Sequence, residues 1–300
     1  MKRALIFAIC FWMTAVAFAQ EEYRKPTILV AGFKNMGNVG RSEADIVRNT
    51  IISSLSKQSR VQLVDLETET TLTTEQKRRL SEATIEDFMA NGGEEMSRMV
   101  ANYIVVGSVS DMTITQKEHK SDKGTTYSYE AKVTYVVKAV SSKNGTIAYS
   151  GTLTSSKTKD TRDEARSAAL SSAGLGCGFV QYLAPLTGEV YEGDYTEKKG
   201  RLLTCYIKLG AIHGVREGDY FDIQKVKYVA GEALYEEVGV LKVTDVHNKI
   251  AECQVRKKGA EEVLAAMKQY LRDRSLNPEA ARPLVVTSRC DGGGGLLNFF

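Results

Sequence analysis

Hydrophobic positions in the first half of the chain follow two periods, one helical and one of strict alternation. Residues 27–33 (TILVAGF) form a short apolar run that predicts a buried strand. Apolar residues then recur every four positions, which predicts an amphipathic helix over residues 43–57. The stretch SEAD at residues 42–45 has the pattern of a capping box and marks the start of that helix. The positions on its apolar face are Val47, Ile51 and Leu55.

A long alternating stretch follows later in the same half. From Tyr127 to Ala139, Tyr, Val and Ala occupy every second position, which predicts a long strand with one apolar face. Asn144-Gly145 favours a type I′ turn, so a partner strand is expected to start at Ile147. The other elements expected here are strands at 60–66 and 103–109 and helices at 73–90, 94–101 and 160–173. Together they predict an α/β sandwich, with helices on one mixed or antiparallel sheet, over residues 26–175.

The second half changes to short strands separated by glycine turns. Five apolar segments at roughly ten-residue spacing predict a small all-β, barrel-like domain over residues 183–258. A C-terminal helix is expected at 260–272, inside a last segment, 259–300, that ends in a flexible Gly-rich tail. The chain as a whole is therefore expected to be α+β. A dense turn, GAIHGVREGD, supplies the candidate motif of the β domain: Gly210, Gly214, Gly218 and Asp219.

The first residues have the pattern of an export signal. A positive pair precedes an apolar run over residues 4–16, which is too short for a spanning helix, and a small-x-small motif follows. We expect residues 1–19 to be a signal peptide, with an uncleaved anchor as the alternative. Cys10 lies inside the apolar run, directly after bulky Ile9, so it is not expected to carry a lipid. The candidate signal-peptidase residues are Ala17 and Ala19.

The last residues are apolar beyond a run of four glycines. An exposed LLNFF segment is unfavourable in water, so we expect it to bind another protein. The candidate partner-binding residues are Leu296, Leu297, Phe299 and Phe300.

Charge gives no reason to expect a nucleic-acid partner. The net formal charge is +3, and removal of Lys2 and Arg3 with the signal peptide lowers it by two. Apolar content of 43% and charged content of 26% are ordinary for a globular protein. The expected partners are therefore other proteins.

Four cysteines follow the expected signal peptide, and none has a C-x-x-C spacing. They are too few for a disulfide scaffold in a chain of this length. Export permits a bridge, but the sequence leaves open whether Cys205/Cys253 or Cys177/Cys290 are paired. We expect buried free thiols.

Catalytic patterns are missing from the sequence. His119, His213 and His247 are far apart and have no metal-ligand spacing. GLGCGF at 174–179 follows a helix rather than a strand, so it does not fit a dinucleotide loop. The loop at 32–41 follows a strand and precedes a helix, but it lacks the Gly-Lys-Ser/Thr ending of a phosphate loop. We expect a non-enzyme without cofactor or metal, and keep phosphate or nucleotide binding at residues 32–41 as an alternative.

Three segments of the first half resemble the CsgG-like family of bacterial envelope proteins. These are PTILVAGFKN, VQLVD and ANYIVVGSVSDM, and the match spans about residues 26–155. The family includes the curli assembly and transport component and is similar in fold to lipoprotein activators of penicillin-binding proteins. Its pore-forming members are acylated on an N-terminal cysteine, which this chain lacks.

The second half is similar to the C-terminal domain of flagellar assembly protein T. The glycine turn and Gly239 carry this resemblance, which covers about residues 183–258.

Both resemblances imply a non-catalytic periplasmic protein that assists secretion, assembly of a surface structure or activation of an envelope enzyme. They also imply other envelope proteins as partners, a possible homo-oligomer and possible peripheral association with the outer membrane. The alternative implied by the CsgG-like resemblance is a subunit of an outer-membrane secretion pore, whose lipid-facing hairpin would lie at residues 125–155.

Overall fold

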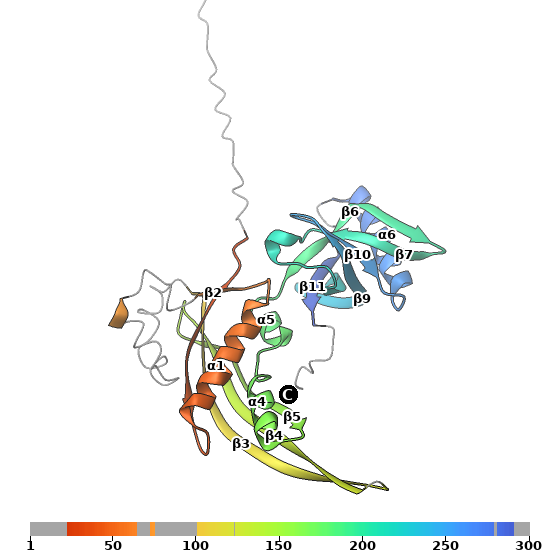
Figure 1. Cartoon of the computed structure of the whole chain (residues 1–300). Coiled ribbons are helices and arrows are strands. Elements are labelled where there is room, and N and C mark those ends of the chain that lie inside the picture. The colour runs from red at the N-terminus through yellow and green to blue at the C-terminus, as the bar shows by residue number, and fades with distance from the viewer. Residues whose placement is uncertain (1–22, 65–72, 76–100, 123, 279–280, 291–300) are drawn as a thin grey trace, which may run out of the picture.

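A computed structural model describes residues 23–64, 73–75, 101–122, 124–278 and 281–290. Two separate hydrophobic cores divide them into a sheet domain and a barrel domain (Figure 1). The elements of the sheet domain are β1 Thr27–Asn35, α1 Arg41–Ser56, β2 Gln62–Val64, β3 Tyr103–Ser121, β4 Gly124–Ser141, β5 Ile147–Lys159, α4 Arg162–Leu170 and α5 Cys177–Leu183. The elements of the barrel domain are β6 Thr187–Lys198, β7 Arg201–Ile207, η2 Ala211–His213, β8 Tyr220–Val229, β9 Glu232–Val246, β10 Ala251–Val255, α6 Ala260–Leu276 and β11 Val285–Arg289.

The sheet domain has a mixed five-stranded sheet in the order β2-β1-β3-β4-β5. Strand β1 is parallel to β2 and β3, whereas β3, β4 and β5 form an antiparallel meander. Helices α1 and α4 lie on one face of this sheet, as Figure 1 shows. This arrangement confirms the predicted sandwich. The expected helices at 73–90 and 94–101 lie almost entirely outside the described residues.

Helix α1 buries the stripe that the periodicity predicts, since Val47, Ile51 and Leu55 are fully buried. Its start differs from the prediction. The N-cap is Gly40, and the carboxylate of Glu43 accepts a hydrogen bond from the Gly40 amide. The predicted Ser42–Asp45 capping box is therefore wrong by two residues, because Glu43 is the residue that lies three positions beyond the cap.

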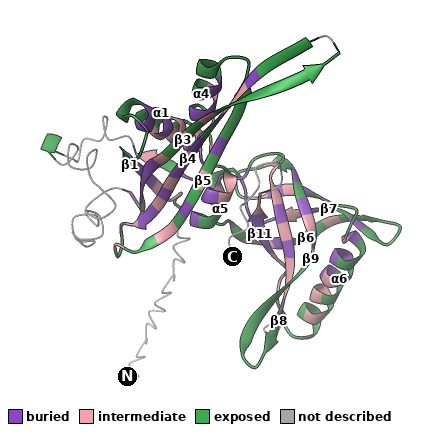
Figure 2. Cartoon of the chain, turned by 90° about the horizontal axis from the view of Figure 1, so that it is seen from below, coloured by how far each residue is buried: buried purple, intermediate pink, exposed green. Residues whose placement is uncertain are grey.

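Strands β3 and β4 continue past the helices as a long curved arm (Figures 1 and 2). The register of this pair shifts between Val109 and Asp111, where β1 ends its pairing with β3. Such a bulge bends the strand that carries it. Beyond it most residues of the arm are exposed, so the arm presents two faces to its surroundings.

The turn between β4 and β5 is not the predicted type I′ turn. That turn needs positive φ at both central residues, but only Gly145 has one (φ 68°). The Asn144 side chain instead accepts hydrogen bonds from the amide and hydroxyl of Thr146. The hairpin forms as expected with a longer turn.

The barrel domain is a closed six-stranded barrel in the order β10-β7-β6-β11-β8-β9. Five of its strands match the predicted segments. The sixth, β11, lies in the segment 259–300 that the sequence assigned to a helix and tail, and it pairs with β6 and β8. The barrel therefore extends beyond the expected boundary at residue 258.

Helix α6 packs on the outside of β9 at a place where two glycines allow close approach. A Cβ at Gly239 would lie 2.6 Å from Val263 Cγ2, and a Cβ at Gly259 would lie 2.7 Å from Val238 O. Val263, Leu264 and Met267 are buried there. The overall α+β class is as predicted. The described helices include none with the length and apolar content that a membrane crossing requires.

We predict that Ile51→Ala destabilises the protein by about 2–5 kcal/mol, because it removes buried methyl groups and leaves a cavity. Ile46→Ala is the matched control on the same helix, since Ile46 is 41% exposed, and should cost less than about 1 kcal/mol. Urea unfolding measures both. Equal losses would contradict the assignment of α1's buried face.

Candidate functional site

The glycine turn predicted as a motif of the β domain lies against the sheet domain. Gly214 ends η2 with φ 85°, and a Cβ there would collide with the carbonyl oxygen of Ser59. The Ser59 hydroxyl donates a hydrogen bond to the Gly214 carbonyl. From the same turn, Arg216 Nη1 donates to the Lys57 carbonyl at 2.9 Å. The turn is thus part of the joint between the two domains.

Asp219 and Gly210 fix the shape of this turn. Asp219 Oδ2 accepts a hydrogen bond from the Arg216 amide at 3.0 Å. Gly210 has no room for a side chain, because a Cβ would lie 2.5 Å from the carbonyl oxygen of His247. Gly218 has φ 87° and open space around it, so only the left-handed backbone, and not a lack of room, favours glycine at this position.

Arg60 is the charged centre of the joint. It is only 8% exposed, and it lies in the loop between α1 and β2. Its Nη2 lies 3.5 Å from Asp219 Oδ2 of the barrel domain, and its Nη1 donates to Gln181 Oε1 of α5 at 3.1 Å. A buried guanidinium needs such acceptors, and the barrel domain supplies one of the two.

Gln181 extends this network to the last strand of the barrel. Its side-chain oxygen accepts from Ser288 Oγ at 2.8 Å, and its amide nitrogen donates to the Ser288 carbonyl. Ser288 Oγ also accepts from the Leu186 amide at 3.0 Å. Ser288 is 1% exposed, so these bonds are shielded from water.

A disulfide between Cys177 and Cys290 crosses the same joint. The Cα atoms are 6.0 Å apart, and the bond joins the start of α5 to the residue after β11. The chain between them, which contains the whole barrel, spans a sequence separation of 113. The expectation of free thiols is therefore wrong for this pair, whose residues come together only in the folded chain.

Cys205 and Cys253 are free and buried, as expected. They lie opposite each other on β7 and β10. Burial raises the pKa of Cys205 to about 12, and burial, with Cys205 as neighbour, also raises the pKa of Cys253. Thiols in this state are poor nucleophiles, so the pair does not form a reactive centre.

A small cavity of about 170 Å³ lies inside the joint. Arg60, Arg216 and Arg289 line it together with Asp219 and the disulfide. Each arginine has an acceptor, since Arg289 Nη1 lies 2.5 Å from Asp222 Oδ1. The cavity is best explained as packing space between the domains.

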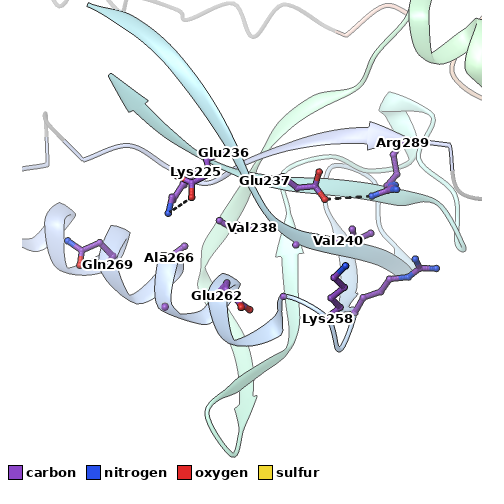
Figure 3. A pocket seen from close by; sticks show the side chains of 14 residues that line it. Lys225, Glu236, Glu237, Val238, Val240, Lys258, Glu262, Ala266, Gln269 and Arg289 are labelled. Atoms are coloured by element: carbon purple, nitrogen blue, oxygen red, sulfur yellow. Dashed lines mark ion pairs between the residues drawn. The ribbon is translucent and has the colours of Figure 1, made fainter. Parts of the chain in front are cut away.

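A larger groove of about 900 Å³ runs between β9 and α6 (Figure 3). Its floor contains Val238 and Ala266, and charged side chains line its rim. Lys225 pairs with Glu236 at 3.1 Å, and the dashed lines of Figure 3 mark this pair and a longer one from Arg289 to Glu237. The lining combines charges of both signs with few apolar side chains, unlike the mostly apolar pockets that bind small molecules.

The three histidines lie on separate elements, as predicted. His119 contacts Ser128 Oγ in the β3–β4 arm, and His247 lies 3.6 Å from Asp245. His213 Nδ1 accepts from the Gly210 amide, its ring lies 5.1 Å from Tyr23, and burial lowers its pKa. The described part of the chain contains no group of three or more His, Cys, Asp or Glu side chains that could hold a metal ion.

The loop at 32–41 is held by side-chain hydrogen bonds to β3 and to the start of α1. Asn38 donates to the Met112 carbonyl at 2.8 Å and accepts from the Met112 amide at 3.1 Å. At the start of α1, the Glu43 carboxylate binds the Gly40 amide and pairs with Arg166. This carboxylate lies where a phosphate would have to bind.

Two sets of predicted site residues lie outside the described residues. These are the signal-peptidase residues Ala17 and Ala19 and the tail residues Leu296, Leu297, Phe299 and Phe300. No sequence pattern indicated the other residues of the joint. Ser59, Arg60, Gln181 and Ser288 are single polar residues with no local motif, and only the fold brings them together.

Comparisons with known proteins give no family. No family model matches the chain, and no curated protein matches it. Solved structures with some backbone similarity include lipoprotein GNA1162 from Neisseria meningitidis, with 14% identity over 45% of this chain and 85% of that one, at a TM-score of 0.32.

Two further structures are the LpoB C-terminal domain from Escherichia coli and the PelC dodecamer from Paraburkholderia phytofirmans. The first has 17% identity over 44% of this chain and 84% of that one, at a TM-score of 0.25. The second has 16% identity over 53% of this chain and 87% of that one, also at a TM-score of 0.25. Scores this low carry no argument about function, and none of the three is named as a curli component.

We predict that Gly214→Ala opens the domain joint, whereas Gly218→Ala does not. Both residues have a left-handed backbone, so each substitution costs about 1–2 kcal/mol in conformation. Only the Cβ at position 214 would also collide with the sheet domain. Small-angle scattering and hydrogen exchange of residues 57–60 measure the opening. The same response in both variants would contradict the contact.

We predict that the chain from residue 20 onward has two free thiols, both hidden in the native state. At pH 8 the raised pKa of Cys205 leaves almost no thiolate, and burial excludes reagent. Alkylation followed by mass spectrometry should label neither thiol in the native protein. In urea without reductant it should label Cys205 and Cys253 alone. Labelling of Cys177 or Cys290 would contradict the disulfide.

Proposed function

We propose that this protein is a non-catalytic, exported envelope protein that acts by binding other proteins in the periplasm. The disulfide across the domain joint is the observation that best supports export. Disulfides form and persist in oxidising compartments such as the periplasm, and this one joins two domains that are already in contact. The signal pattern at residues 1–19 supports the same location, without lipid on Cys10.

The joint also supports a role as an assembly factor. A disulfide, the buried Arg60 network and the Gln181–Ser288 bonds hold the two domains at a fixed geometry. Exposed surfaces on both domains are then presented at constant spacing. In this proposal the sheet domain and the barrel domain are two docking modules that serve secretion, assembly of a surface structure or activation of an envelope enzyme.

Three exposed tyrosines mark surfaces on which such partners could bind. Tyr127 lies on the β3–β4 arm, Tyr182 on α5 and Tyr228 at the end of the β8–β9 hairpin, and each is more than half exposed. Figure 2 shows the arm and this hairpin as exposed projections. Tyrosine is enriched in protein interfaces because it combines apolar area with a hydrogen-bonding group.

The pore alternative requires the hairpin of residues 125–155 to enter lipid. A lipid-facing strand carries an apolar face. On the outer arm, Glu118 is opposite Tyr127 and shares its face, and Lys117 pairs with Glu130 at 2.6 Å on the other face. These charges favour an arm in water.

The phosphate alternative requires the loop at 32–41 to accept an anion. The Glu43 carboxylate already accepts a hydrogen bond from the Gly40 amide, and its negative charge would repel a bound phosphate. This favours a structural role for the loop. Thermal stabilisation by a panel of nucleotides and inorganic phosphate would be needed to revive the alternative.

We predict capture of envelope proteins by a photo-crosslinking amino acid placed at the exposed tyrosines. Benzoylphenylalanine replaces Tyr127, Tyr182 or Tyr228, one at a time, and is crosslinked by light in living cells. Tyr135, which is 3% exposed, is the matched control and should capture only its own chain. Mass spectrometry identifies the captured proteins.

Absence of any captured envelope protein, or recovery of the chain with its leader in the cytosol, would contradict the proposal. Recovery in carbonate-resistant outer-membrane pellets together with conductance in planar bilayers would replace it with the pore. Crosslinks between copies of the chain alone would indicate a homo-oligomer.

A further inference from the structure

The outer edge of the open sheet carries a long stretch without charge. Strand β5 is last in the strand order, and among the described strands it pairs with β4 alone. Residues 147–156 (IAYSGTLTSS) contain no charged residue and no proline. The first charges on the strand are Lys157 and Lys159 at its far end.

Such an edge is unusual in a soluble protein. Natural sheets protect edge strands with charges, prolines, bulges or a covering segment, because exposed N–H and C=O groups otherwise recruit other strands. The one register shift in β5 lies at its start, between Ile147 and Tyr149, and residues 149–156 pair regularly with β4. An uncharged run of this length with β-branched and aromatic residues also has the composition of an aggregation-prone segment. We infer that another strand covers this edge.

Helix α5 and the disulfide bring the end of the described chain to the beginning of β5. The Phe179 ring of α5 lies 4.9 Å from the Tyr149 ring of β5. Cys177 starts the same helix and is bonded to Cys290, with the two Cα atoms 6.0 Å apart. Along a helix, the two residues from Cys177 to Phe179 advance only about 3 Å. The described chain therefore ends, at Cys290, near the start of β5.

We propose that the segment Leu296–Phe300 of the same chain docks along the edge of β5 as an added strand. Asp291 and four glycines precede it. Five extended residues reach about 17 Å, which is enough to span from Cys290 to the edge of β5. The segment would start where β5 starts, so it would run parallel to β5. It offers backbone groups to the edge and apolar side chains to the surroundings.

The flanking surface suits an apolar strand. The exposed ring of Tyr182 lies 5.6 Å from Tyr149, and Ile147 at the start of β5 is 37% exposed. Alternate residues of LLNFF would place Leu297 and Phe299 on one face, and Leu296, Asn298 and Phe300 on the other. Aromatic and aliphatic contacts of this kind stabilise neighbouring strands.

Tethering favours this occupant over a second copy. A short flexible linker gives an effective concentration near the millimolar range, far above that of a second chain in solution. The contact would form in the isolated protein, so it goes beyond the proposed envelope function and does not depend on it. A partner that binds the tail would then have to displace it from β5.

Hydrogen exchange of the chain from residue 20 onward tests the proposal against a variant that lacks residues 292–300. Within residues 147–156, we expect the outward-facing amides opposite the docked segment to exchange about tenfold faster in the shortened variant, because their outer partners are lost. Their protection in the longer chain should not change on hundredfold dilution. Exchange of α1 and of the barrel strands should be the same in both.

Thr152→Lys supplies an independent readout. Thr152 is exposed on β5, and a lysine there should obstruct the edge and speed exchange of residues 296–300. Thr125→Lys, at an exposed position near the end of the arm, is the matched control and should leave them unchanged. Unaltered β5 exchange after deletion would overturn the proposal. Protection that falls on dilution would also overturn it, in favour of a second copy.

Discussion

Burial of the Arg60 guanidinium is the constraint on which the relation between the two domains depends. An uncompensated buried charge would cost several kcal/mol, so Arg60 must keep its acceptors. One acceptor, Gln181, comes from the sheet domain and the other, Asp219, from the barrel domain. Separation of the domains would break the Arg60–Asp219 contact and the Gln181–Ser288 bonds, and would leave only the Arg60–Gln181 bond intact. The two domains therefore behave as one unit in spite of their separate cores.

Closure of the barrel and formation of the joint involve the same strand. Strand β11 pairs with β6 and β8 and thereby completes the barrel. Its penultimate residue, Ser288, bonds Gln181, and the residue after the strand, Cys290, bonds Cys177. A crosslink over a loop of this length restricts the unfolded chain by about 4–5 kcal/mol in the chain-entropy account. The disulfide thus stabilises barrel and joint together.

Hydrophobic periodicity predicted the strands and helices that a single segment determines. It missed the contacts that form between segments far apart in the chain. The alternation from Tyr127 to Ala139 became β4, and the apolar stripe of α1 became its buried face. Strand β11 was missed because five residues after a helix give too little pattern for an assignment. The glycine spacing at 210–218 revealed a turn, but nothing local indicated that the turn would meet the Ser59 carbonyl. The pairing of Cys177 with Cys290 could not be predicted for the same reason, because the two residues are too far apart in the sequence to form a local motif.

The two domains solve the problem of strand edges in different ways. The barrel closes on itself and has no unpaired edge in its ring of six strands. The open sheet has two edges. On one side the described part of β2 has three residues, whereas β5 on the other side has thirteen. The β3–β4 arm protects its exposed faces with ion pairs such as Lys117–Glu130. The first ten residues of β5 carry no charged side chain. An added strand would therefore stabilise the sheet domain at this edge more than any other part of the protein.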